Sequence, residues 1–228
     1  FEKEGYRVCL GENSTGQLNY FSGDTKSRLD DFQSALNNKE VKAIVCARGG
    51  YGCVQLVDLI DWSQFKLNPK WIVGFSDVCY LHHRILCLGK RGIHGSMPLN
   101  FESNTVPALD SLFKALAGKQ YSLESAPVSH NQTGECQGKL VGGNLSIIYS
   151  LLGTNDQIDY SNTVLFIEDL SEHLYHLDRM LYSFKKAGVL NSIKGLIVGG
   201  MTDMKDTQPP FGLGVEEIIL SHVDSLDI

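Results

Sequence analysis

The chain has 228 residues, of which 43% are hydrophobic and 20% are charged. This balance is that of a globular protein and excludes a disordered or fibrous chain. The 26 acidic and 20 basic residues give a formal net charge of −6, and no basic run stands out. The charge therefore argues against nucleic acid or an anionic membrane as the main partner.

The first half of the chain alternates between strand-like and helix-like segments. Asp24 is a candidate N-cap for a helix that carries Leu29, Phe32 and Leu36 on one face. Strands are predicted at Tyr6–Leu10, Val41–Ala47 and Trp71–Phe75, and further helices at Cys53–Leu59 and from Val78 to Leu88. This β-α-β-α order predicts a parallel sheet that is covered by helices.

A segment rich in Ser, Gln, Asn and Gly, residues 118–138, divides the chain. It predicts a linker between an N-terminal α/β domain, residues 1–117, and a C-terminal domain, residues 139–228. In the second domain, strands are predicted at 139–141, 164–167 and 195–198, and helices start near Leu145, Leu174 and Val215.

The six cysteines form no CxxC pair and no zinc-finger arrangement with histidines. Cys9 and Cys46 fall inside apolar runs, so we expect buried free thiols there. This usage favours a reducing compartment, and we expect a cytoplasmic protein. No apolar run reaches the ~20 residues of a membrane-spanning helix, so no membrane partner is expected.

Ser76 is the sharpest candidate for chemistry, because it lies where a predicted strand gives way to a helix. A serine on such a turn presents its hydroxyl above the sheet edge, and the helix N-terminus behind it favours developing negative charge. The motif runs Gly74-Phe75-Ser76-Asp77-Val78, so its fifth residue is valine and the G-x-S-x-G pattern of a nucleophile elbow is not met. A simple helix N-cap is an equally good interpretation of Ser76.

A glycine-rich loop follows the second predicted strand, from Arg48 to Gly52. Ligands of parallel sheets bind at the carboxyl ends of strands, and both this loop and Ser76 occupy such ends. Three glycines let backbone N–H groups converge on an anion, as an oxyanion hole requires. The alternatives are a plain turn or a phosphate-binding loop, although the loop lacks the G-x-G-x-x-G spacing and the Walker lysine. Arg48 could bind a substrate carboxylate or be a surface charge.

Glu168 ends a predicted strand, where a carboxylate could orient a histidine or simply be solvated. The histidines give no compelling general base. His173 and His176 have a spacing that suits a metal, but no third ligand is evident. His222 lies near the apolar face of the last predicted helix, where we expect a packed or half-exposed side chain.

Taken together, several motifs resemble the L,D-carboxypeptidase family, which also contains the microcin-immunity serine peptidases. They are residues 43–52, 73–77, 94–97, 142–145, 166–169 and 175–181, and they span nearly the whole chain in order. The resemblance implies an N-terminal Rossmann-like domain with a parallel sheet, a smaller C-terminal α/β or β-rich domain, and a site in the cleft between them.

The resemblance also implies a Ser-His-Glu triad, with Ser76 as nucleophile and Glu168 as acidic member. The N–H groups of Gly50 and Asp77 would form the oxyanion hole. Arg48, Gly49 and Asn144 would contact the substrate. Two hydrogen bonds across one imidazole put the side-chain oxygens of Ser76 and Glu168 roughly 6–8 Å apart.

The implied reaction hydrolyses the L,D bond to the terminal D-alanine of a murein tetrapeptide during cell-wall recycling, through an acyl-enzyme. The implied partner is this small muropeptide, with no metal or organic cofactor, and a homodimer is compatible with the sequence. An alternative within the family is an amidase that acts on a peptide-nucleotide antibiotic.

The sequence departs from the family at three places. The family's histidine follows the last amphipathic helix in a Gly-His pair, and His222 does not match it. We therefore expect the general base beyond Ile228 and an incomplete C-terminal domain; the alternative is a non-catalytic fragment. The family's first strand is expected before Phe1, and Ser96 stands where many members have proline.

Overall fold

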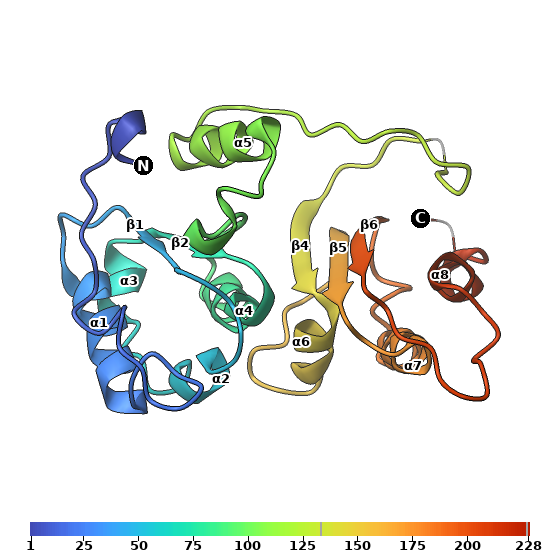
Figure 1. The fold of residues 1–228 in the computed structure, drawn as a ribbon. Helices are drawn as coiled ribbons and strands as arrows, with labels where there is room; N and C mark the ends of the chain where they lie inside the picture. Colours follow the sequence, from blue (N-terminus) through green and yellow to red (C-terminus); the bar gives the residue numbers. More distant parts are fainter. Residues whose placement is uncertain (133, 227) are drawn as a thin grey trace. The chain divides into compact units, whose positions relative to one another are not determined.

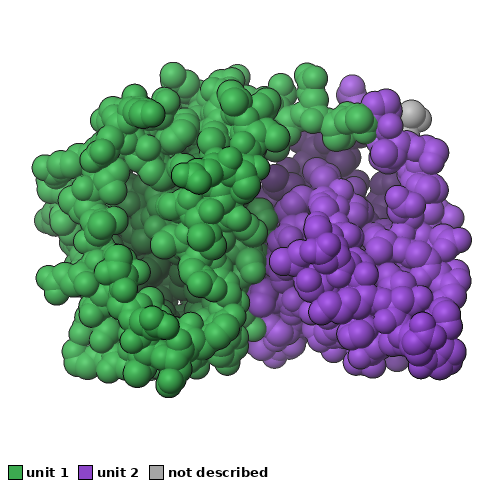
Figure 2. Space-filling model, in the orientation of Figure 1, with its two compact units in different colours: residues 1–126 green, residues 127–228 purple. Residues whose placement is uncertain are grey.

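The computed structural model describes residues 1–132, 134–226 and 228. The chain divides into two compact units, Phe1–Ala126 (unit 1) and Pro127–Ile228 (unit 2), which are shown in Figures 1 and 2. Each unit contains a three-stranded parallel sheet with helices, so the predicted α/β class is confirmed. Within the described residues, no helix has the length and apolar character needed to cross a membrane.

Unit 1 is built on a parallel sheet with the strand order β1-β2-β3. Its strands are β1 (Ala43–Val45), β2 (Trp71–Gly74) and β3 (Ile93–His94). Its α-helices are α1 (Thr25–Asn37), α2 (Cys53–Leu56), α3 (Ser63–Leu67), α4 (Cys79–Cys87) and α5 (Val106–Leu116). Short 3-10 helices cover Glu2–Glu4 (η1), Ser76–Val78 (η2) and Pro98–Asn100 (η3).

The central strand of unit 1 is buried on both faces, as parallel strands covered by helices are. Ile72 and Val73 of β2 are fully buried, and Ile72 lies in a core that also contains Leu36, Phe65 and Ile85. The predicted N-cap of α1 is confirmed, because the Asp24 carboxylate accepts a hydrogen bond from the Ser27 N–H at 2.7 Å.

Unit 2 contains a second parallel sheet, in which β4, β5 and β6 lie side by side (Figure 1). The strands are β4 (Lys139–Asn144), β5 (Thr163–Leu170) and β6 (Gly195–Thr202), and the helices are α6 (Leu145–Ser150), α7 (Leu174–Lys186) and α8 (Val215–Val223). Helix α6 begins directly where β4 ends, so a polar residue at that junction is held by both elements.

Three local predictions are wrong or incomplete. Tyr6–Leu10 is not a strand: the segment is exposed, and the Tyr6 ring packs on Phe113 of α5 instead of entering a sheet. Helix α2 ends at Leu56, three residues earlier than predicted, and helices α3 and α5 were not predicted. Cys9 is exposed rather than buried, because the irregular segment that carries it packs on no sheet.

Candidate active site

Ser76 lies on a strained turn between β2 and α4. Its φ is +60°, in the left-handed region that non-glycine residues rarely adopt. The N-cap interpretation of Ser76 is wrong, because Phe75 precedes η2 as its N-cap and Val78 is the N-cap of α4. Such strain at a strand-to-helix turn is the backbone feature of a nucleophile elbow, even without the second glycine of the sequence pattern.

The glycine loop after β1 contacts Ser76 directly. A Cβ atom added at Gly49 would lie 3.0 Å from Ser76 Cβ and 3.2 Å from Ser76 Oγ, tighter than ordinary packing allows. Gly50 has a φ of +108° and Gly52 a φ of +136°, which only glycine adopts at little cost. The structure of unit 1 therefore brings together the two motifs that the sequence singled out.

Asp77, the residue after Ser76, ties this turn to the start of α2. Asp77 is buried, and its Oδ2 accepts a hydrogen bond from the backbone N–H of Cys53, the first residue of α2, at 2.8 Å. Its other carboxylate oxygen has no partner among the described residues. Burial raises the pKa of Asp77, while the Cys53 hydrogen bond and the charge of Arg28 act in the opposite direction.

Arg28 of α1 supports the end of the glycine loop, a role that no sequence motif indicates. Its guanidinium lies over the Phe21 ring, 4.5 Å from the centroid, and donates to Gln55 Oε1 at 2.7 Å and to the Gly52 carbonyl at 3.4 Å. Arg48, by contrast, is exposed at the loop itself. A Cβ atom at Gly50 would lie 3.6 Å from an Arg48 guanidinium nitrogen, so this side chain folds back over the loop.

Glu168 of unit 2 lies near the end of β5, opposite Asn144 of β4 in the ladder. The pairing of β5 with β6 shifts between Ile167 and Asp169, so Glu168 sits at a bulge-like irregularity, a feature that re-aims side chains. Burial and, to a lesser extent, the charge of Asp169 raise the pKa of Glu168 to about 7, against the effect of a hydrogen bond from Asn144.

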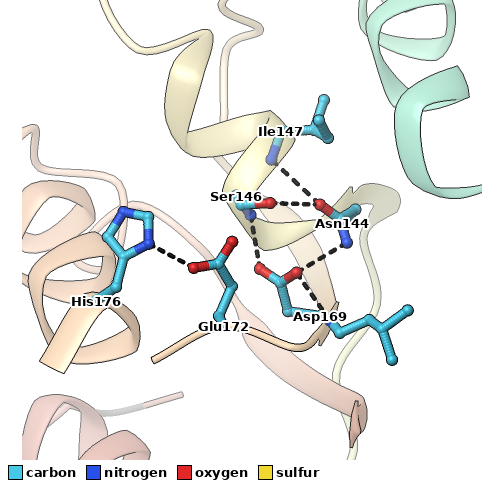
Figure 3. Close-up of polar contacts among 7 residues, drawn as sticks. Asn144, Ser146, Ile147, Asp169, Glu172 and His176 are labelled. Atoms are coloured by element: carbon cyan, nitrogen blue, oxygen red, sulfur yellow. Dashed lines mark hydrogen bonds and ion pairs between the residues drawn. The ribbon is translucent and has the colours of Figure 1, made fainter. Parts of the chain in front are cut away.

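A buried hydrogen-bond network anchors this part of unit 2 (Figure 3). Asp169 accepts from Asn144 Nδ2 at 3.0 Å and from the Ser146 N–H at 2.8 Å. The Asn144 Oδ1 atom accepts from Ser146 Oγ at 2.8 Å and from the Ile147 N–H at 3.3 Å, and so caps α6. The amide of Asn144, predicted to contact substrate, is thus already engaged within unit 2.

Three histidines of unit 2 contact other side chains of that unit. His222 is buried, the first of the two expected outcomes; its Nε2 lies 2.8 Å from Asp178 Oδ1, and its ring meets Tyr182 edge-on. The His176 Nδ1 atom lies 2.6 Å from Glu172 Oε2, as Figure 3 shows. The His173 ring stacks on Tyr175. His173 and His176, whose spacing suits a metal, therefore each contact a different side chain.

Comparison with known proteins agrees with this architecture. The model of the LD-carboxypeptidase N-terminal domain matches residues 1–95, and that of the LD-carboxypeptidase C-terminal domain matches residues 137–228. The two matches identify the chain as a peptidase, which is a hydrolase, with carboxypeptidase function. It belongs to the LD-carboxypeptidase family.

Two relatives and one solved structure illustrate the similarity. The probable murein peptide carboxypeptidase of Bacillus subtilis (strain 168) is 33% identical over 231 residues, which cover 98% of this chain and 72% of the relative. The murein tetrapeptide carboxypeptidase of Pseudomonas aeruginosa is 29% identical over 216 residues, 89% of this chain and 69% of the relative. The microcin C7 self immunity protein in complex with aspartyl sulfamoyl adenosine has the same fold, with a TM-score of 0.85 at 21% identity over 100% of this chain and 77% of that chain.

Proposed function

We propose that the protein is a serine-type L,D-carboxypeptidase that removes the terminal D-alanine from murein tetrapeptides in cell-wall recycling in the cytoplasm. Its relatives from Bacillus subtilis and Pseudomonas aeruginosa, which carry murein peptide carboxypeptidase names, support this substrate class. In the proposed reaction, a serine hydroxyl attacks the carbonyl of the L-centre, D-alanine leaves, and water hydrolyses the acyl-enzyme.

The observation that carries the proposal is the strained Ser76 turn packed against Gly49. A nucleophile needs an exposed hydroxyl with backbone donors beside it for the oxyanion of the tetrahedral intermediate. In the proposal, the N–H groups of Gly50 and Asp77 are those donors. The positive φ at Gly50 and the strain at Ser76 support this assignment, because both set the direction of neighbouring N–H groups.

Glu168 is the acidic member of the proposed triad, and a histidine is the base. The raised pKa of Glu168 supports this role, because it reflects a half-buried carboxylate. An imidazolium ion that forms beside such a carboxylate lowers the pKa of the carboxylate, and the charged carboxylate stabilises the imidazolium. His222 is not the proposed base, since it is buried and bonded to Asp178. The proposal requires roughly 6–8 Å between the side-chain oxygens of Ser76 and Glu168 in the active protein.

Arg48 is proposed to bind the terminal carboxylate of the substrate. Its exposed guanidinium lies beside Gly50, so it offers a planar pair of donors next to the proposed oxyanion hole. A carboxypeptidase needs such a group, because it must recognise the free carboxylate one residue beyond the bond that it cleaves. No metal or organic cofactor takes part in the proposed reaction.

The test is the release of D-alanine from a murein tetrapeptide by the full-length protein. Ser76→Ala is expected to lower kcat by about 10⁴-fold or more, as loss of the nucleophile does in other triads. Ser103→Ala, which changes an exposed serine of unit 1, serves as the control and should retain the wild-type rate. Equal release by Ser76→Ala and the wild type would refute the proposal.

A second candidate function is an amidase that acts on peptide-nucleotide conjugates. The shared fold with the microcin C7 self immunity protein supports it, although the identity is only 21%. A competition assay with a murein tetrapeptide and an aspartyl sulfamoyl adenosine analogue separates the two. If kcat/KM is higher for the nucleotide conjugate, the conjugate and not the muropeptide becomes the proposed substrate.

A further inference from the structure

A cluster of soft metal-ligating side chains lies in unit 1, outside the residues assigned above. The ligand atoms of Cys79, His82 and His94 all lie within 4.8 Å of one another. In the part of the chain that the structure describes, no other group of three or more His, Cys, Asp or Glu side chains meets this criterion. The proposed hydrolysis uses none of these three side chains.

The fold assembles this cluster from two elements. Cys79 and His82 are three residues apart on α4, so both lie on one face of the helix. His94 ends β3, where the ladder pairs it with Gly74 of β2. The cluster therefore lies beside the β2–α4 turn that carries Ser76, and it joins the helix behind that turn to the neighbouring strand.

The spacing of one pair of donor atoms is close to that in a zinc site. The Cys79 Sγ and His94 Nδ1 atoms are 3.8 Å apart. A tetrahedral ion with a Zn–S bond of about 2.3 Å and a Zn–N bond of about 2.0–2.1 Å separates sulfur and nitrogen by roughly 3.5 Å. A shift of a few tenths of an ångström would bring these atoms to that separation.

The His82 ring is held in the tautomer that a metal ligand needs. Its Nε2 lies 3.1 Å from the Ile72 carbonyl oxygen, which can only accept, so Nε2 carries the hydrogen and donates it. The lone pair is then on Nδ1, and a backbone carbonyl behind a metal-binding histidine is the usual supporting contact. Gly92 packs against this ring: a Cβ atom there would lie 2.6 Å from His82 Cδ2, so the ring has little freedom to turn.

The cluster is buried on one side and open to solvent on the other. Cys79 is fully buried, whereas His94 retains exposed surface. A bound ion would therefore be reached from the His94 side, where a water molecule can complete the coordination.

We propose that Cys79, His82 and His94 bind one Zn²⁺ ion, with a fourth position open to solvent. One thiolate and two imidazoles are the donor set that zinc prefers over magnesium or calcium. The alternative is a metal-free cluster in which the Cys79 thiol makes a weak hydrogen bond to His94. The ion has no part in the proposed hydrolysis, so the two proposals fail independently.

The test is a titration of the reduced, chelator-treated and untagged protein with Co²⁺, followed by displacement with Zn²⁺. The expected result is one Co²⁺ per chain, with the thiolate-to-cobalt charge-transfer band and the intense visible bands of tetrahedral Co²⁺. His94→Asn should weaken Co²⁺ binding by at least about tenfold, and Cys79→Ser should remove the charge-transfer band. Cys87→Ser, which changes an exposed cysteine at the other end of α4, is the matched control and should bind as the wild type does.

A second readout is thermal unfolding. Zn²⁺ should raise the Tm of the wild type and of Cys87→Ser but not that of His94→Asn, because a ligand that binds only the folded state stabilises it. If the buried Cys79→Ser variant does not fold, His94→Asn decides the question, since His94 is exposed. Absence of saturable Co²⁺ binding to the wild type, or wild-type binding by His94→Asn, would overturn the zinc site.

Discussion

The backbone N–H of Cys53 donates a 2.8 Å hydrogen bond to the buried carboxylate of Asp77. This bond joins the helix that follows the glycine loop to the residue that follows Ser76. The same turn has a second close contact, because a Cβ atom at Gly49 would lie only 3.0 Å from the Ser76 Cβ atom. The strained serine is therefore held between a hydrogen bond and a close backbone contact, both within unit 1.

The first prediction concerns the Asp77 carboxylate as a tether. Asp77→Ala leaves the Cys53 N–H without its acceptor and should lower the free energy of unfolding by about 1–3 kcal/mol. The glycine loop loses its link to Ser76, so kcat should fall as well. Chemical denaturation and D-alanine release measure the two effects.

Asp77→Asn is the matched control, because its amide oxygen can still accept from Cys53 while no charge is buried. It should keep the wild-type stability at pH 7 or exceed it, since burial disfavours the charged form of Asp77. Equal destabilisation by the Asn and Ala variants would contradict the tether.

The second prediction concerns the close approach of Gly49 to Ser76. Gly49→Ala adds a Cβ atom at 3.0–3.2 Å from the serine side chain, so the loop or the serine must move. The displacement needed is a few tenths of an ångström, less than the 1 Å that can cost about 10²-fold, so we expect kcat to fall by about tenfold. Gly134→Ala, where a Cβ atom meets nothing within 4 Å, should leave kcat unchanged. A wild-type kcat for Gly49→Ala would show that this contact does not position the nucleophile.

The sequence predicted the parts of this architecture that depend on local signals. The cap at Asp24 follows from an N-cap residue type just before apolar residues at helical spacing, and β2 follows from an apolar run. The glycine loop and Ser76 were predicted at strand ends, because strand ends are where parallel sheets bind ligands.

The contacts that hold the site together could not be predicted in the same way. The Cys53–Asp77 hydrogen bond joins residues 24 positions apart, and the left-handed conformation of Ser76 is imposed by that surrounding structure. The cysteine spacings also gave no sign of a metal cluster, because His94 reaches Cys79 from a neighbouring strand.

The third prediction concerns the pH dependence that Glu168 gives to folding. Its pKa rises from an ordinary value of 4.5 to about 7 in the folded protein. Below pH 4.5 the Glu168 carboxyl is neutral in the folded and the unfolded protein, and above pH 7 it is charged in both. The free energy of unfolding therefore falls as the pH rises from 4.5 to 7. The loss is on the order of 3 kcal/mol.

Glu168→Gln should remove this part of the pH dependence, as measured by urea denaturation between pH 4.5 and 7.5. Glu216→Gln, which changes an exposed glutamate at the start of α8, should follow the wild-type curve. Parallel curves for Glu168→Gln and the wild type would contradict the raised pKa.

The fourth prediction concerns Asn144 as a structural centre of unit 2. Asn144→Ala removes the N-cap of α6 and a hydrogen bond to the buried Asp169. The two losses together should lower the free energy of unfolding by about 2–4 kcal/mol. The control Asn131→Ala alters an exposed position and should change stability by less than about 0.5 kcal/mol. A change as small as that of the control would mean that the network in Figure 3 contributes little.

The central claim is that Ser76 is the nucleophile of this LD-carboxypeptidase, and the most direct measurement is the site of acylation. The protein is mixed with a murein tetrapeptide, quenched with acid during turnover, digested and analysed by mass spectrometry. We predict that the acyl group, which is the substrate without its D-alanine, is attached to Ser76 and is absent from Ser76→Ala. An adduct on another residue, or undiminished D-alanine release by Ser76→Ala, would contradict the claim.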